Sequence, residues 1–126
     1  MADLKSAGSI AVRVRVPLSV PLRIYMIEIK SEAEFTTLIN TEDIVLVDFY
    51  APWCGPCKFL KTTLESLEPD NEDIKFYKCS IEDFTYPTVR SVPTVIIFKN
   101  GNPVDTLLGA LPAKHYVEAF NKAREV

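Results

Sequence analysis

The sequence predicts an α/β domain built on a mixed, five-stranded central sheet with helices on both faces. Two apolar, β-rich runs, residues 44–50 and 94–99, are typical of strands buried on both faces. Segments with helical spacing of apolar residues lie between or after such strands, an order typical of α/β domains. An Asn-Gly pair at residues 100–101 is typical of a tight turn and adds an antiparallel pair of strands.

Length and composition limit the function classes. A chain of 126 residues with 48% hydrophobic and 25% charged residues fits one globular domain. A net charge of -3 argues against a nucleic-acid-binding surface, and no uncharged apolar run is long enough to cross a membrane. We therefore expect neither a nucleic acid nor a membrane among the partners.

The first residues differ from the rest, and we expect an N-terminal extension over residues 1–23 and the domain over residues 24–126. Residues 1–25 carry four basic residues and one acidic residue, and residues 10–16 partly alternate as an edge strand does. Arginines interrupt any apolar core of a secretory signal. An organellar transit peptide, a cloning remnant and a start upstream of Met26 all stay open.

The first half of the domain alternates strand and helix. Residues 24–29 are expected to form a short strand, and Ser31 with Glu34 forms a capping box that opens a helix to about Ile39. Residues 44–50 (IVLVDFY) form a buried strand. A helix over residues 57–67 follows, with apolar residues at helical spacing at Phe59, Leu60, Leu64 and Leu67.

The second half contains three strands and a final helix. We expect strands over residues 74–81, 94–99 and 104–108, the last two joined by the Asn-Gly turn. Pro112 suits a first helical turn. The final helix is expected to bury a stripe made of Tyr116, Val117, Phe120 and Ala123.

A Cys-x-x-Cys motif carries the chemistry. Cys54 and Cys57 lie between a buried strand and the start of a helix, where backbone N–H groups and the helix dipole stabilise a thiolate. Attack by Cys54 on a disulfide and resolution by Cys57 would transfer two electrons. A zinc site would need further ligands, but Cys79 and His115 lack finger spacing. A purely structural disulfide this short would constrain the unfolded chain little.

Three segments resemble the thioredoxin family in order and spacing. They are residues 47–58 (VDFYAPWCGPCK), residues 91–94 (SVPT, like the family's cis-proline loop), and residues 98–101 (FKNG) with Gly109 after the next strand. The resemblance covers about residues 24–124 and implies the thioredoxin fold. It also implies a protein-disulfide reductase that keeps the cell's redox balance.

The resemblance implies roles around the cysteines. Cys54 is the expected nucleophile, Cys57 the resolving thiol, and Gly55 with Pro56 the spacer of a reductant. Asp48 lies in an apolar strand with apolar same-face neighbours, so burial should raise the pKa of its carboxyl. By similarity it exchanges the proton of Cys57, and Lys78 matches the family's nearby lysine.

The same resemblance implies a substrate-docking surface. Trp53 is expected to face the substrate, and a cis peptide between Val92 and Pro93 to expose the Val92 backbone for strand-like pairing. Gly109 is expected to border this surface. No bound cofactor is implied: the redox group is the Cys54–Cys57 disulfide, and NADPH acts only through a thioredoxin reductase.

The sequence also departs from the family pattern. Thr62 stands where family members often place a proline, and residues 81–93 are shorter than usual, so the third helix is expected to shrink to a turn. Cys79 is interpreted as a buried free cysteine.

Three functions stay in competition. We expect a monomeric, cytoplasmic reductant of disulfide-containing proteins, with organellar targeting by residues 1–25 left open. An oxidase or isomerase domain of a secretory compartment is the alternative that Tyr50-Ala51-Pro52 favours, although it lacks a spacer histidine. An interaction module of the same fold is the third.

Overall fold

The computed structural model describes residues 26–126, so every prediction for residues 1–25 lies outside the described part. The elements in chain order are β2 (Ile27–Ile29), α1 (Glu32–Thr41), β3 (Ile44–Tyr50), α2 (Gly55–Leu67), the short 3-10 helix η1 (Glu68–Asp70), β4 (Ile74–Ser80), β5 (Thr94–Lys99), β6 (Asn102–Leu108) and α3 (Ala113–Glu125). Strand and helix alternate in the first half, and three strands and a final helix follow, as predicted.

The strands form one mixed sheet of five in the order β2-β4-β3-β5-β6. β4 pairs in parallel with both β2 and β3, whereas β5 runs antiparallel to β3 and to β6. The predicted sheet is confirmed. β6 starts two residues earlier than predicted because pairing continues through Asn102 and Pro103, past an irregularity at Ile97/Phe98.

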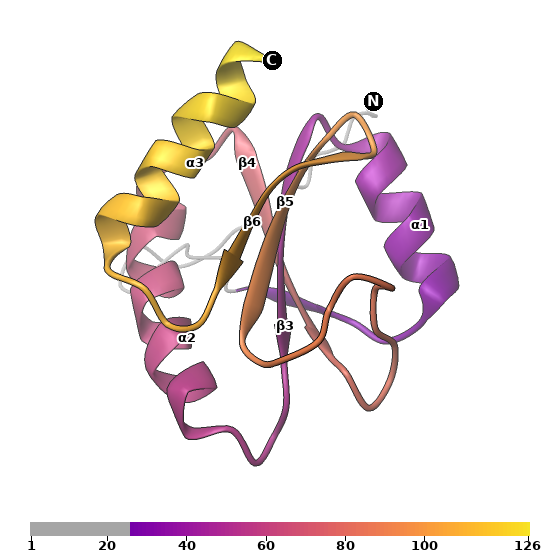
Figure 1. Ribbon diagram of the computed structural model, residues 1–126. Helices are drawn as coiled ribbons and strands as arrows, with labels where there is room; N and C mark the ends of the chain where they lie inside the picture. Colours follow the sequence, from indigo (N-terminus) through magenta and orange to yellow (C-terminus); the bar gives the residue numbers. More distant parts are fainter. Residues whose placement is uncertain (1–25) are drawn as a thin grey trace, which may run out of the picture.

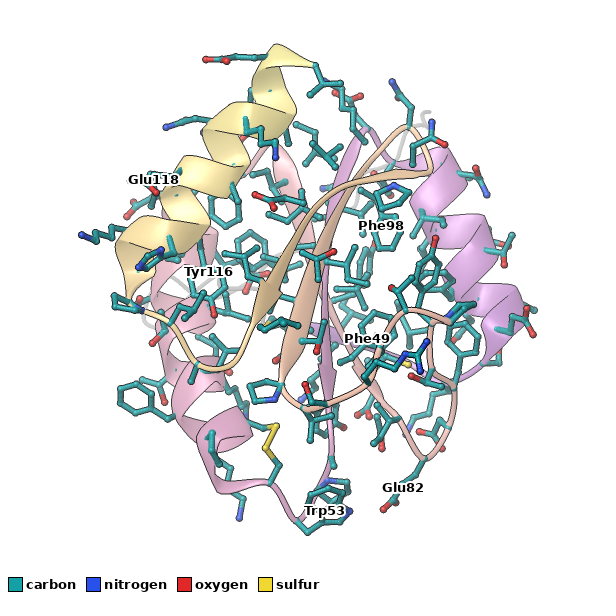
Figure 2. The ribbon with its side chains drawn as sticks, in the orientation of Figure 1. Phe49, Trp53, Glu82, Phe98, Tyr116 and Glu118 are labelled. Atoms are coloured by element: carbon teal, nitrogen blue, oxygen red, sulfur yellow. A yellow bond between two sulfur atoms is a disulfide. The ribbon has the colours of Figure 1, made fainter. Side chains whose placement is uncertain are left out.

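Helices cover both faces of the sheet, with α1 on one side and α2 and α3 on the other (Figure 1). Alternation along β3 supplies both cores. Leu46 belongs to the cluster under α2 and α3, and Val45 to the cluster under α1. Figure 2 shows Tyr116 between α3 and the sheet, while Phe49 and Phe98 point to the α1 side.

Both early helices begin at a side-chain cap. Ser31 accepts a hydrogen bond from the Glu34 N–H at 3.2 Å, and the Glu34 carboxylate accepts one from the Lys30 N–H at 2.7 Å. α2 begins at Gly55, two residues before the predicted start, because Cys54 caps it. The predicted capping box of α1 is therefore present, except that the Glu34 carboxylate accepts its hydrogen bond from the N–H of Lys30 and not from that of Ser31.

Val117, expected in the buried stripe of α3, and Phe59, one of the apolar residues at helical spacing in α2, are exposed. Val117 is 36% exposed and Phe59 is 67% exposed. Each follows or precedes a buried residue, Tyr116 or Leu60, by one position, which turns it about 100° around the helix axis toward solvent. The stripe predicted for α3 is correct at Tyr116, Phe120 and Ala123 and wrong at Val117.

Residues 81–93 form turns and bends and no helix. The expected shortening to a turn of the helix that the family has in this segment is therefore confirmed. The segment starts where the Ser80 carbonyl accepts hydrogen bonds from the Asp83 and Phe84 N–H groups, and this ends β4 one residue early. None of the helices in residues 26–126 has both the length and the apolarity needed to cross a membrane.

Candidate redox site

A disulfide joins Cys54 and Cys57 at the N-terminus of α2, with a Cα–Cα separation of 5.3 Å. Cys54 is the N-cap residue, and the Cys57 N–H donates a hydrogen bond to Cys54 Sγ at 3.1 Å. The first turn of a helix has unpaired N–H groups that point at its N-cap. The spacing that lets the two sulfurs bond therefore also aims a backbone donor at Cys54.

The disulfide is largely covered, while its neighbour Trp53 is open. Cys54 and Cys57 are 5% and 4% exposed, whereas Trp53 is 70% exposed. Ala51 completes a small buried cluster with the two cysteines, and the half-buried Val92 packs against it. Figure 2 shows Trp53 at the end of the molecule where the disulfide lies. A partner reaching the sulfurs would therefore meet the indole and the Val92 segment.

Asp48 is a buried carboxyl in the middle of β3, as predicted. It is 3% exposed, and Asp48 Oδ1 has no hydrogen-bond partner within residues 26–126. Burial raises the pKa of Asp48 to about 7, and the positive charge of Lys78 partly opposes this rise. Alternation places Asp48 on the face of Leu46, which α2 and α3 cover.

Lys78 is Asp48's partner in the register of β3 and β4, so the structure brings these two predicted residues together. On its other side, Lys78 is in register with Glu28 of β2. The Tyr50 hydroxyl donates a hydrogen bond to the Glu28 carboxylate. Glu28 did not stand out in the sequence, because a strand register across β4 cannot be derived from local patterns.

The Val92–Pro93 peptide is cis, as expected, and it precedes β5. The Gly109 N–H donates a hydrogen bond to the Pro93 carbonyl at 2.9 Å, so these two predicted residues are adjacent. Gly109 has φ of +82°, which favours glycine, and its carbonyl accepts a bond from the Tyr116 hydroxyl at 3.2 Å. α3 thereby fixes the Gly109 turn beside the cis peptide.

Cys79 is separate from the redox pair. It is a free, fully buried cysteine in the cluster under α1, and its thiol donates to the Phe84 carbonyl at 3.4 Å. Burial and the charges of Asp83, Glu28 and Glu34 raise its pKa to about 11. A thiol of this kind packs as a small apolar side chain at neutral pH.

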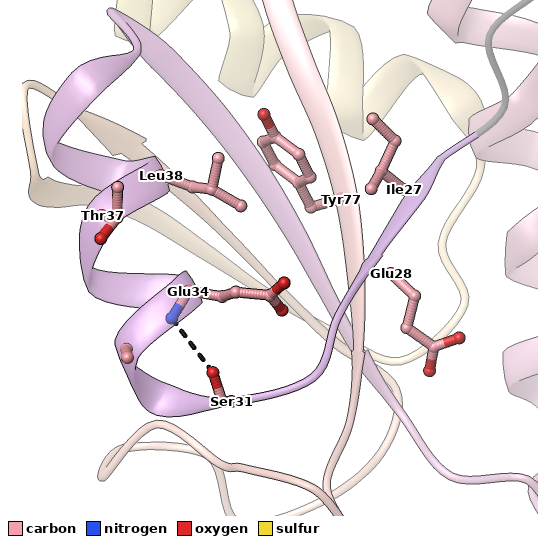
Figure 3. Close-up of a pocket in the computed structure, with 8 residues that line it drawn as sticks. Ile27, Glu28, Ser31, Glu34, Thr37, Leu38 and Tyr77 are labelled. Carbon is pink, nitrogen blue, oxygen red and sulfur yellow. Dashed lines mark hydrogen bonds between the residues drawn. The ribbon is translucent and has the colours of Figure 1, made fainter.

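A groove of about 490 Å³ lies between β2 and α1. Ile27, Leu38 and Tyr77 give it apolar walls, and Ser31 and Glu34 lie at one end (Figure 3). The helix that borders it covers the face opposite α2, so the groove is not part of the redox site. Within residues 26–126 no three His, Cys, Asp or Glu side chains form a group that could hold a metal.

Comparisons with known proteins agree on one family. The family model described as thioredoxin matches residues 26–122. A thioredoxin of Chlamydia caviae is 38% identical over 101 residues, which are 77% of this chain and 98% of the relative. Thioredoxin M4 of Arabidopsis thaliana, a chloroplastic protein, is 41% identical over 65% of this chain and 46% of the relative.

A solved structure agrees as well. Mitochondrial thioredoxin 3 of Saccharomyces cerevisiae, in its oxidised form, superposes with a TM-score of 0.69 at 29% identity, covering 76% of this chain and 94% of that one. With a matching family model, a capped Cys-x-x-Cys disulfide and the cis-proline loop beside it, the chain belongs to the thioredoxin family, and the Cys54–Cys57 disulfide is its redox-active group.

Proposed function

We propose that Cys54 is the nucleophile and Cys57 the resolving thiol of this thioredoxin-type disulfide oxidoreductase. The hydrogen bond from the Cys57 N–H to Cys54 Sγ carries the proposal. In the reduced protein the same donor would stabilise a Cys54 thiolate, together with the positive end of the α2 dipole. Cys57, inside the helix, lacks the N-cap position that favours ionisation.

The reaction is a pair of thiol–disulfide exchanges. The Cys54 thiolate attacks one sulfur of a substrate disulfide, so a Cys54–substrate disulfide forms and the other substrate sulfur leaves as a thiolate. Cys57, once deprotonated, attacks Cys54 Sγ and closes the Cys54–Cys57 disulfide. The second substrate sulfur then leaves and takes up a proton. Two electrons have passed to the substrate, and the oxidised protein is the state that the structure describes.

Asp48 is proposed to accept the proton of Cys57, directly or through water, and so to become a neutral carboxylic acid. Lys78 is proposed to stabilise the Asp48 carboxylate before the proton arrives. A carboxyl with a pKa of about 7 can both take and return a proton near neutral pH. If so, replacing Asp48 with Asn slows resolution of the mixed disulfide most strongly around neutral pH. Single-turnover kinetics against pH measure this directly.

The substrate-docking surface is proposed to combine Trp53, the cis Val92–Pro93 segment and Gly109. Exposure of the indole and the short link between Gly109 and Pro93 support one continuous surface around the sulfurs. The Val92 backbone would pair with an extended substrate segment, as strand-addition sites do. Gly55 and Pro56, exposed in the spacer, would leave room for the substrate sulfur.

Serine variants test the two thiol roles. We expect Cys54→Ser to abolish disulfide reduction without forming any mixed disulfide. Cys57→Ser should instead form a mixed disulfide that accumulates, because nothing resolves it; mass spectrometry of the adduct measures this. Cys79→Ser serves as the matched control and should retain turnover. Accumulation of the adduct in Cys54→Ser and not in Cys57→Ser would reverse the assignment.

Membership in the family implies a thioredoxin reductase as electron donor and disulfide-containing proteins as substrates. We propose that the chain works as a monomer in the cytoplasm and that residues 24–126 are its functional domain. Organellar relatives, one chloroplastic and one mitochondrial, support targeting as the alternative. An isomerase or oxidase role and a thiol-independent interaction role remain the competing functions, and the serine variants separate the latter.

A further inference from the structure

Three charged side chains form one row across the parallel half of the sheet. Glu28 of β2 is in register with Lys78 of β4, and Lys78 is in register with Asp48 of β3. Partners in register on neighbouring strands carry their side chains on the same face. Lys78 therefore lies between two carboxyl groups, whose strands are about 10 Å apart at the usual strand spacing.

A hydrogen bond fixes the outer carboxylate. Tyr50 lies two residues after Asp48, on the same face of β3, and its hydroxyl donates to Glu28 across the intervening strand β4. Figure 3 shows the Glu28 side chain leaving β2 on the side away from Ser31 and the start of α1. The carboxylate is thus held over β4, where Lys78 is half-buried.

We propose that Glu28, held by the Tyr50 hydroxyl, is a positioning residue of the redox site that shares the Lys78 ammonium with Asp48. The proposal rests on the role of Asp48 given above. A lysine drawn partly toward Glu28 stabilises the Asp48 carboxylate less than an undivided lysine would. Glu28 therefore keeps the proton affinity of Asp48 high enough for exchange at neutral pH.

Few other groups on the described elements can change the charge around Asp48. Tyr116 faces it from α3, and the buried residues of α2 are Cys57, Leu60 and Leu64. Its partner on β5 is the apolar Val95. Lys78 is thus the nearby cation in this part of the sheet. Glu28 controls how strongly the Lys78 ammonium stabilises the Asp48 carboxylate.

A titration of Asp48 itself tests the proposal. The carboxyl carbon of Asp48, followed by ¹³C NMR in the full-length oxidised protein, gives the midpoint for the wild type, Glu28→Gln and the exposed control Glu118→Gln. Glu28→Gln frees Lys78 for Asp48, so its midpoint should fall by about half a pH unit. Glu118→Gln removes the same charge elsewhere and should leave it in place. An unchanged midpoint in Glu28→Gln would overturn the proposal.

Two further variants separate sharing from simple repulsion. In a Lys78→Met background the effect of Glu28→Gln should shrink, because there is no ammonium to divide; an undiminished shift would mean direct repulsion and would overturn the sharing. Tyr50→Phe releases Glu28 toward solvent and should lower the midpoint by less than Glu28→Gln does. A rise would show that Tyr50 holds Glu28 away from Lys78, against the proposal.

The titration also keeps this inference distinct from the proposed function. It reports ionisation of Asp48 whether or not Asp48 accepts the Cys57 proton. A shifted midpoint with normal resolution kinetics in Asp48→Asn would uphold the shared lysine and reject the proton-transfer role. An unchanged Asp48 midpoint in Glu28→Gln together with slow resolution in Asp48→Asn would reject the shared lysine and uphold the proton-transfer role.

Discussion

At the scale of single residues, the molecule places an acid where an apolar side chain would be more stable. Asp48 occupies a position of β3 whose neighbours on both sides, Val47 and Phe49, are fully buried, and one of its oxygens has no partner in residues 26–126. A buried polar atom without a hydrogen bond lowers the stability of the fold, because it has lost its contacts with water and gained none in the protein. Such a cost is expected at a site that uses the group chemically.

Replacing Asp48 with Asn should stabilise the oxidised protein, increasingly so as pH rises. The folded-state pKa is raised from 3.8 to about 7, so the protonated form suits the fold. The stability that comes from the raised pKa of Asp48 is fully present below about pH 4, near the pKa of the unfolded chain. It is lost as pH rises through the folded-state pKa of about 7. Asn stays neutral throughout, so the gain should grow over that window toward about 4 kcal/mol. Urea unfolding at pH 5 and pH 8 measures it.

Glu72→Gln, an exposed acid-to-amide change, is the control for this comparison and should show no such growth. If Asp48→Asn changed stability equally at both pH values, the pKa of Asp48 would not be raised by folding.

Residue-scale prediction from sequence succeeded where one strand contained the information. Burial of Asp48 followed from its apolar same-face neighbours along β3, and the structure confirms it. The contact between Tyr50 and Glu28 joins β3 to β2 across β4. Only the order and register of the strands bring those residues together, and no local pattern encodes either.

At the scale of elements, side-chain contacts at the C-terminal end of α3 join this helix to the rest of the fold. The end of α3 is tied to the segment that leads into β4. Arg124 donates to both carboxylate oxygens of Asp73, at 2.7 and 2.9 Å, and to Asn71 Oδ1 at 2.8 Å. Paired guanidinium–carboxylate bonds of this kind are the stronger class of surface ion pair.

Replacing Arg124 with Met should lower stability by about 1 kcal/mol, because the carboxylate pair is lost and the buried Asn71 loses a donor. For a domain of this size the melting temperature should fall by about 4 °C. Thermal unfolding followed by circular dichroism measures it. Lys114→Met, on the same helix and exposed, is the control; an equal fall in both would assign the effect to lost charge rather than to this contact.

Element positions were predictable because apolar periodicity and capping residues act locally. Ser31 and the Asn-Gly turn marked boundaries that the structure confirms. α2 starts at Gly55, two residues before the start that the sequence predicts, because the Cys54 side chain, a cap type that the sequence pattern does not reveal, accepts a hydrogen bond at the helix N-terminus. The predicted burial of Val117 is wrong because successive residues of a helix point about 100° apart, so Tyr116 faces the core and Val117 faces solvent.

At the scale of the whole molecule, the chain is a thioredoxin-type protein-disulfide reductase, and the reduction potential is the quantity that separates a reductant from an oxidase or isomerase. We expect the Cys54–Cys57 pair to have a reduction potential of about -270 mV, which is the value established for thioredoxin itself. The spacer residue Pro56 supplies no charge to stabilise the thiolate further. Equilibration against glutathione buffers measures the potential. A value near -180 mV, as in protein disulfide isomerase, would favour the isomerase alternative.

Removing residues 1–23 should leave the domain folded and active, since residues 26–126 supply a five-stranded sheet with a buried core on each face. The truncated and full chains should then melt at similar temperatures and turn over a disulfide substrate at similar rates. A large loss of stability in the truncated chain would mean that the extension belongs to the domain.

The exposure of Trp53 has an optical consequence. The chain contains one tryptophan, it is 70% exposed, and it directly precedes Cys54. A disulfide quenches the excited state of a neighbouring indole, whereas a pair of thiols does so less. Tryptophan emission therefore comes from one position, and we expect it to increase when the Cys54–Cys57 disulfide is reduced. Emission of the protein itself should then report its oxidation state and allow turnover to be followed in real time without a dye.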